Sequence, residues 1–470
     1  QQGRPPGTEA DRRVQQYVQD RMEEAGLQPA FGSSYVQSFA VTDGVRPTGE
    51  SSLASKGKAI AHALVPFSTS TAAPVEAPLV FVGRGIAPEG KGSGDYAGLG
   101  AKVEGKIVVA LGGAPPDDPH ISPAVTRPQS KLIAARDHGA VGFVLWEPDQ
   151  AVAYPNHGEA NDLTLPAVWV GEEGTPALLA AFGRKAKADQ EAEAVAALEP
   201  GRRSRGSFQL HTPLEPVTLQ TANVSGLLPG VEGGPVIVVG AHMDHLGQGT
   251  SSSLAPGVHA VHNGADDNAS GSALVAELAL AMTAGPAPRR TVVFAHFSGE
   301  ELGLLGSRDL ASRLDAVPPF AGRRVVAMLN VDMVGRLRER LTVSGVGSSP
   351  GWMALLDAAG PHGMRVLYDR ALTLRSDHAP FYERGIPALF FFTELHGDYH
   401  APGDEVVGIL PEGLLQVAEL VADVTRRAAD GHPLPFSAPR TPAEGLVPAL
   451  PGGDPATIVK VVGPDGRPEG

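Results

Sequence analysis

The sequence contains no cysteine, few aromatic residues (5%) and no long apolar run. Without cysteine the chain cannot form disulfides, use a thiolate nucleophile or hold zinc through sulfur, so any metal must bind histidines and carboxylates. A chain free of thiols suits an oxidising compartment, and this one opens at Gln1 as a processed protein does, so we expect a secreted or periplasmic location. No stretch approaches the roughly 20 apolar residues that span a bilayer, so we expect no membrane span.

Basic residues are the minority among the charges: 38 Lys and Arg stand against 52 Asp and Glu, a net charge of -14. Clustered positive charge attracts proteins to nucleic acid and anionic membranes, and no cationic run is present, so neither is an expected partner. The chain is 42% hydrophobic and 470 residues long, longer than the roughly 250 to 300 residues at which a single core stops growing. We therefore expect two folded domains.

The first half of the chain contains short β-type segments. Helical spacing of apolar residues predicts an amphipathic helix over 8–26. Residues 42–73 are rich in Gly, Ser, Thr and Pro without a period, which indicates a linking segment. A helix at 129–138 lies among short apolar strands expected at 79–83, 106–112, 141–146 and 167–171. These elements predict a small β-rich domain.

From about Pro216 longer apolar strands alternate with helices. The strands are expected at 235–240, 291–297, 324–335 and 387–395, and the helices at 272–284 and 302–314. Continuous apolar strands interleaved with helices are typical of an α/β fold whose mostly parallel, mixed central sheet is covered on both faces. The predicted organisation is a discontinuous α/β domain (1–45 and 201–432), an inserted domain (46–200) and a Pro/Gly-rich tail (433–470) without assigned function.

Ligands of such sheets bind beyond the carboxyl ends of the strands. His242 follows the first strand, and Asp244 is placed to accept the other imidazole N–H and so fix its orientation. The alternative is a loop histidine beside a helix-capping aspartate. His245 and His262, nearby, are interpreted as solvated loop residues.

Two more loops carry surplus carboxylates. Asp266, Asp267 and Asn268 precede a long helix, and capping explains only one of them, whereas a carboxylate that bridges two cations would explain the excess. Glu300 and Glu301 follow the next strand. A capping box accounts for Glu301 alone; a metal ligand beside a general base accounts for both.

The last two strand ends add Asp332, which a buried run precedes, and a loop with His396, Tyr399 and His400. A buried charge such as Asp332 is costly unless paired or coordinated. Together the strand ends supply His, Asp, Glu, Asp and His, a set suited to two divalent cations that share one carboxylate. Two metals about 3.5 to 4 Å apart can activate a water and stabilise an oxyanion, which predicts hydrolysis.

These motifs resemble the di-zinc aminopeptidases of peptidase family 28, which also include glutamate carboxypeptidases. The matching stretches, over about 235–405, are GAHMDHLG, GADDNASG, SGEELGLLGS, NVDMVG, SDHAPF and DYHAPGDE. The resemblance implies an aminopeptidase with peptide substrates and two Zn²⁺ per chain. The 74–200 module, with GDYAGLGAKVEGKIVV and ARDHGAVGFVL, looks similar to the protease-associated domain inserted in many members.

The resemblance also implies roles for the individual residues. The implied metal ligands are His242 and Asp332 on one zinc, Glu301 and His400 on the other, and Asp267 bridging both. Glu300 is implied as the general base, Asp244 as the partner of His242, and Tyr399 as the donor to the oxyanion.

Three alternatives stay open. A carboxypeptidase or dipeptidase could use the same metal centre with a positioned cation such as Arg336 or Arg375. A zinc acyltransferase of the glutaminyl cyclase kind would use a single working metal, and a binding protein on this fold would use none. The sequence predicts no oligomeric state.

Overall fold

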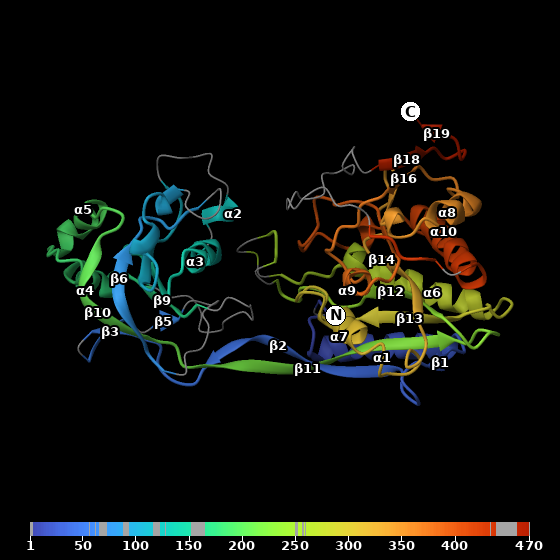
Figure 1. Ribbon diagram of the computed structural model, residues 1–470, viewed down its shortest axis with the longest axis horizontal. Coiled ribbons are helices and arrows are strands. Elements are labelled where there is room, and N and C mark those ends of the chain that lie inside the picture. Colours follow the sequence, from blue (N-terminus) through green and yellow to red (C-terminus); the bar gives the residue numbers. More distant parts are fainter. Residues whose placement is uncertain are drawn as a thin grey trace. The chain divides into compact units, whose positions relative to one another are not determined.

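The computed structural model describes residues 3–55, 57–61, 63–64, 73–87, 94–115, 123–126, 128–151, 165–249, 252–255, 258, 260–432, 434–438 and 458–469. The chain forms two compact units (Figure 1): unit 1 comprises Gln1–Val41 and Leu219–Gly470, and unit 2 comprises Thr42–Thr218. Unit 2 is therefore inserted into the sequence of unit 1. The chain returns to unit 1 later than residue 201, the boundary expected from the sequence, because β10 (Arg203–His211) pairs with strands of unit 2.

Unit 1 is built on an 11-stranded mixed sheet with the order β1-β11-β13-β12-β14-β17-β15-β16-β18-β19, and β2 also pairs with β11. The strands are β1 (Gln28–Pro29), β2 (Val36–Pro47), β11 (Leu214–Leu228), β12 (Val236–His242), β13 (Thr291–Phe297), β14 (Val325–Val331), β15 (Leu341–Ser344), β16 (Val366–Asp369), β17 (Ala388–Phe392), β18 (Ile458–Val462) and β19 (Pro468–Glu469). The central strands β13, β12, β14 and β17 are parallel, so their carboxyl ends meet at one edge.

Helices pack on both faces of this sheet, which explains the unbroken apolar runs of its central strands. One face of β12, through Ile237 and Val239, belongs to a core cluster with α1 (Glu9–Glu24), α6 (Gly271–Thr283), α8 (Trp352–Ala359) and α10 (Pro411–Asp430). The other face, through Val236 and Val238, belongs to a cluster with α7 (Leu305–Ser312) and α9 (Ala379–Glu383). The α/β fold with helices flanking a mixed sheet is thus confirmed.

Unit 2 has its own eight-stranded sheet, with the order β4-β3-β10-β6-β7-β8-β9-β5. Its other strands are β3 (Ser52–Ser55), β4 (Lys58–Ala61), β5 (Ala63–Leu64), β6 (Val75–Phe81), β7 (Ile107–Leu111), β8 (Gly142–Trp146) and β9 (Ala167–Val170). Its helices are α2 (Pro123–Thr126), α3 (Pro128–Asp137), α4 (Thr175–Ala181) and α5 (Glu191–Ala196). Two core clusters, one on each face of the sheet, make unit 2 an independent hydrophobic unit.

Two segments differ from the sequence-based expectation. The presumed linker at 42–73 contributes β3, β4 and β5, because pairing with β10 and β9 supplies backbone hydrogen bonds that its Gly- and Ser-rich sequence does not reveal. Of the predicted tail at 433–470, residues 439–457 lie outside the described residues, and β18 pairs with β16 at the edge of the unit 1 sheet. In the part of the chain that the structure describes, every helix is too short or too polar to cross a bilayer.

Candidate metal centre

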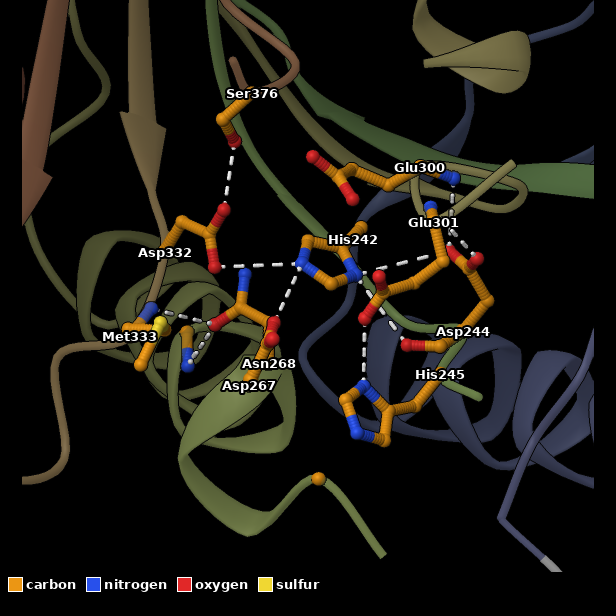
Figure 2. Close-up of polar contacts among 12 residues, drawn as sticks. His242, Asp244, His245, Asp267, Asn268, Glu300, Glu301, Asp332, Met333 and Ser376 are labelled. Atoms are coloured by element: carbon orange, nitrogen blue, oxygen red, sulfur yellow. Dashed lines mark hydrogen bonds and ion pairs between the residues drawn. The ribbon is translucent and has the colours of Figure 1, made fainter. Parts of the chain in front are cut away.

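Polar side chains gather where the parallel strands of unit 1 end. His242 ends β12, and Asp332 follows β14, whereas Glu300 and Glu301 follow β13. Asp267 belongs to a distorted turn, Ala265–Ser270, that leads into α6. Figure 2 shows the carboxylates of Asp267 and Asp332 beside the His242 ring, with the Glu300 side chain extending into the same space. His400 enters from the loop after β17, so the structure brings all five predicted ligands together.

The two carboxylate oxygens of Asp267 face two different groups of ligands. His242 Nε2 lies 3.2 Å from Asp267 Oδ1 and 3.3 Å from Asp332 Oδ1. His400 Nε2 lies 3.3 Å from Asp267 Oδ2 and 3.1 Å from Glu301 Oε2. Each half of the site thus offers one imidazole nitrogen and one terminal carboxylate, and Asp267 belongs to both halves. Asp267 thus contacts both imidazoles, one through each of its carboxylate oxygens.

Neighbouring groups orient the candidate ligands. His400 Nδ1 donates to the Ser252 carbonyl at 2.9 Å, which directs Nε2 into the site. Ser376 Oγ donates to Asp332 Oδ2 at 2.7 Å, which leaves Oδ1 facing His242. In each of these two side chains one polar atom is held by a hydrogen bond, and the other, His400 Nε2 or Asp332 Oδ1, faces the site and is available to bind a metal.

Asp244 orients the site differently from the expectation. Its backbone carbonyl lies 3.3 Å from His242 Nδ1, whereas its carboxylate is 3.7 Å away, beyond hydrogen-bond range. The carboxylate instead accepts the backbone N–H groups of Glu300 at 3.2 Å and Glu301 at 3.4 Å. Asp244 thus links the loop after β12 to the loop after β13, and its main chain rather than its side chain holds the imidazole.

The other polar groups at the start of α6 have structural partners. Asp404 accepts the backbone N–H groups of Asp266 at 3.0 Å and Asp267 at 2.9 Å. Asp266 Oδ1 accepts from Gly335 N at 2.6 Å, and the Asn268 amide donates to the Val331 carbonyl at 2.9 Å. Asp266 and Asn268 therefore fix the turn that presents Asp267 to the two histidines.

The prediction that His245 and His262 are solvated is wrong. His245 is 1% exposed, and its Nδ1 lies 2.7 Å from Glu301 Oε1, the oxygen that does not face His400. His262 is fully buried against Ser253 Oγ at 2.8 Å. Both histidines are therefore buried in the protein instead of facing solvent. The only sequence signal for His245 was its place in the GAHMDHLG stretch.

Arg4 supports the site from the N-terminal segment, and no sequence motif pointed to it. Its guanidinium donates to the carbonyls of Met243 at 2.9 Å and Gly264 at 3.0 Å, and to the Asn263 carbonyl. Met243 follows His242, and the other two carbonyls precede Asp267. One side chain therefore ties together the two loops that carry these ligands.

Glu300 and Tyr399 face the site without belonging to the ligand set. Burial raises the pKa of Glu300 well above its usual range; nearby His242 opposes this and Glu301 adds to it. The Tyr399 ring stacks on the His400 ring with centroids 3.9 Å apart. Burial also raises the pKa of Tyr399, so its hydroxyl stays protonated and can donate a hydrogen bond.

The electrostatics of the site fit divalent cations. Burial lowers the pKa of His400, but the contacts with Asp267 and Glu301 outweigh burial and raise it to about 10. Asp332 and Glu300 likewise outweigh burial and raise the pKa of His242. The carboxylates thus demand positive charge at both imidazoles, and two nitrogens with three carboxylates form a donor set that zinc accepts.

Residues 223–425 match the sequence profile of peptidase family M28. The chain carries an M28 peptidase domain. A probable leucine aminopeptidase of Arthroderma otae is 30% identical over 219 residues, which cover 42% of this chain and 55% of the relative. Aminopeptidase YwaD of Bacillus subtilis is 33% identical over 171 residues, covering 34% of this chain and 36% of the relative. The chain thus aligns with about half or less of the length of these relatives.

Solved structures of two bacterial proteins share the fold of this chain. An aminopeptidase from Aneurinibacillus sp. strain AM-1 superposes with a TM-score of 0.55 and 22% identity over 95% of each chain. BSAP, a zinc aminopeptidase from Bacillus subtilis, superposes with a TM-score of 0.54 and 22% identity over 92% of this chain and 91% of its own. At this identity the comparison shows the α/β fold alone.

Proposed function

We propose that the M28 domain is an aminopeptidase with two zinc ions, which hydrolyses the N-terminal residue from peptides. The observation that carries this proposal is the division of Asp267 between two ligand groups, one with His242 and Asp332 and one with His400 and Glu301. The names of the relatives add support for aminopeptidase activity and for zinc. In this proposal His242 and Asp332 would hold one ion, Glu301 and His400 would hold the other, and Asp267 would be shared by both.

The chemistry that the metals supply when bound is polarisation of the scissile carbonyl and a lowered pKa of bound water. Glu300 accepts the proton of the attacking water and returns it to the leaving amine, since its carboxylate lies in the site without a hydrogen bond to any described residue. Tyr399 donates its hydroxyl proton to the oxyanion that develops on the substrate. Asp244 keeps Glu300 and Glu301 in place through their backbone N–H groups.

The pocket beside the centre favours a substrate with a free amine. It encloses ≈ 970 Å³, part of it open to solvent, and its walls include Asp267, Glu300, Asp332, Asp369 and Glu394. A carboxypeptidase would need a cation there. Arg336, one candidate, is engaged by Asp398 at 2.6 Å and Asp404 at 2.7 Å. Arg375 lines the pocket, so the carboxypeptidase alternative rests on this residue.

We also propose that unit 2 is a protease-associated domain and that the protein is secreted or periplasmic. The insertion of a separate α/β unit between the two parts of unit 1 supports the first proposal. The absence of cysteine supports the second. Fractionation of cells that make the native protein tests the location, and recovery in the cytoplasm alone would contradict it.

The activity is tested with Leu-p-nitroanilide and an N-acetylated dipeptide that has a free carboxylate, each with and without chelator and zinc add-back. We expect cleavage of the anilide alone, lost with chelator and restored with zinc. Cleavage of the blocked dipeptide alone would instead indicate a carboxypeptidase. Cyclisation of an N-terminal glutamine with one metal per chain would indicate the acyltransferase, and a metal-free, inactive protein would indicate a binding role.

A further inference from the structure

We propose that this pocket selects peptides whose N-terminal residue is basic, Lys or Arg, and that Asp369 recognises the cationic end of that side chain. The inference rests on the proposed aminopeptidase function and names its substrate class. The residues concerned lie on β17, β15 and β16, and β17 neighbours β14, the strand that Asp332 follows.

The floor of the pocket is a row of side chains across three strands. Ser344 of β15 is paired with Phe390 of β17 on one side and with Asp369 of β16 on the other. Residues directly opposite one another point to the same face of a sheet, and all three line the pocket. Adjacent strands are about 4.8 Å apart, so the row extends roughly 10 Å from Phe390 to Asp369.

The polarity of the floor changes along this row. Phe390 and Phe392 form the part that belongs to β17, which pairs with β14 and so lies nearest Asp332 and the metal centre. Ser344 and Asp369 form the more distant part. Lys and Arg side chains have the matching order, an apolar stem followed by a cationic head. A substrate held by its amine at the centre would therefore place its stem on the phenyl rings and its head at the carboxylate.

The polar groups of the floor are free to bind such a head. Asp369 is 7% exposed; its Oδ1 accepts from Ala371 N at 2.9 Å, and it forms no ion pair with any described residue. The hydroxyls of Thr342 and Ser344, 8% and 7% exposed, form no side-chain hydrogen bond within the described part of the chain. A largely buried carboxylate gains most from a cationic partner, because water compensates it poorly.

Among the charged groups near the pocket, Asp369 is the one available to recognise a cationic substrate side chain. Glu394 also lines the pocket, but Arg340 Nη2 lies 2.6 Å from its Oε1 and compensates its charge. Arg375 is the one Lys or Arg among the described lining residues, and it is exposed. If Arg375 governed recognition instead, the pocket would prefer an acidic N-terminal residue, and the experiment below separates the two cases.

The test measures kcat/KM of the zinc-loaded full chain on the p-nitroanilides of Lys, Arg, Leu and Glu. The wild type is expected to cleave the Lys and Arg anilides at least about 100-fold better than the Glu anilide. Asp369→Asn keeps an oxygen for the Ala371 N–H but loses the charge, so Lys and Arg cleavage should fall roughly 10- to 100-fold while Leu cleavage changes less than about threefold. Asp315→Asn, which removes a charge at a side chain 90% exposed, is the matched control and should change no ratio.

Three results would overturn the proposal. The wild type could cleave the Leu anilide but show no preference for the Lys and Arg anilides over the Glu anilide, or it could prefer the Glu anilide. Asp369→Asn could also lose the same factor of activity on every anilide. These leave the aminopeptidase itself intact. Failure to cleave any anilide would reject the proposed function and this inference with it, so the two failures are distinguishable. Asp369→Leu, which cannot accept a hydrogen bond, should shift preference further from Lys towards Leu.

Discussion

At the scale of the residue, substitution of two histidines in the loop after β17 can test which side chains bind metal. His400 contacts Asp267 and Glu301, whereas His396 lies 3.3 Å from Asp266 Oδ2, outside the ligand set. We expect His400→Ala to lose one of two zinc equivalents, because the remaining groups of that half no longer complete a site. His396→Gln is the matched control and should keep both. Metal analysis after dialysis checks this, and unchanged stoichiometry in His400→Ala would remove His400 from the ligand set.

Adjacent glutamates test the separation of proton transfer from metal binding. Glu300→Gln should retain metal and fold but lose about 10²- to 10⁴-fold in kcat, because an amide cannot accept the proton of the attacking water. Glu301→Gln should instead lose metal, since Glu301 Oε2 lies 3.1 Å from His400 Nε2. Zinc content and anilide kinetics of the two variants check the contrast. Near-native turnover of Glu300→Gln would exclude Glu300 as the base.

Arg4 allows a test at the scale of the element, because it connects two ligand-bearing loops. Arg4→Met leaves the carbonyls of Met243, Asn263 and Gly264 without their charged donor, and we expect faster loss of zinc to a chelator. Arg4→Lys retains the charge and part of the hydrogen bonding, so it should recover part of the metal retention. Chelator-induced loss of activity followed over time checks both. Equal rates in wild type and Arg4→Met would show that the loops hold the metals without this contact.

Lys131 of α3 gives unit 2 a pH dependence of its own. Its side chain is buried and donates to the carbonyls of Leu111 at 2.6 Å and Gly113 at 2.7 Å. Burial, with a contribution from Arg84, lowers the pKa of Lys131 from 10.5 to about 8. Between these values the folded state has released the proton that the unfolded state still binds. The free energy of unfolding should therefore rise by up to about 3 kcal/mol as pH increases from 8 to 10.5.

The Lys131→Met variant should not show this rise in the free energy of unfolding, and Lys106→Met, at a partly exposed lysine, should still show it. Denaturant unfolding followed by the fluorescence of Trp146 and Trp169, both in unit 2, measures the effect in a Trp352→Phe background. If the free energy of unfolding changed with pH in the same way in wild type and Lys131→Met, the rise could not be assigned to Lys131.

The elements differ in how well the sequence revealed them. β12, β13 and β14 were predictable because a strand buried on both faces is an unbroken apolar run, and a carboxylate after such a run stands out. β15 and β16 have only four residues each, too few to show a period, yet they carry Ser344 and Asp369 of the pocket floor. The contacts of His245 with Glu301 and of Arg4 with Met243 join residues 56 and 239 positions apart, which no local pattern encodes.

At the scale of the whole molecule, the chain consists of two units with separate cores, and the candidate metal centre lies in unit 1. Asp267, Glu301 and Asp332 crowd that centre, and their mutual repulsion lowers the stability of unit 1 when no cation compensates it. A ligand that binds only the folded state stabilises it by about 4 kcal/mol when present at 1,000 times its Kd. Zinc should therefore stabilise unit 1, and its removal should leave unit 2 unaffected.

The three tryptophans separate the two units in one experiment, since Trp352 is in unit 1 and Trp146 and Trp169 are in unit 2. In a Trp146→Phe, Trp169→Phe background, chelator should lower the thermal midpoint reported by Trp352 by several degrees. In the Trp352→Phe background the midpoint should stay constant. A shift of equal size in both backgrounds would mean that the units unfold as one cooperative body, and no shift in either would mean that the carboxylates of unit 1 bind no metal.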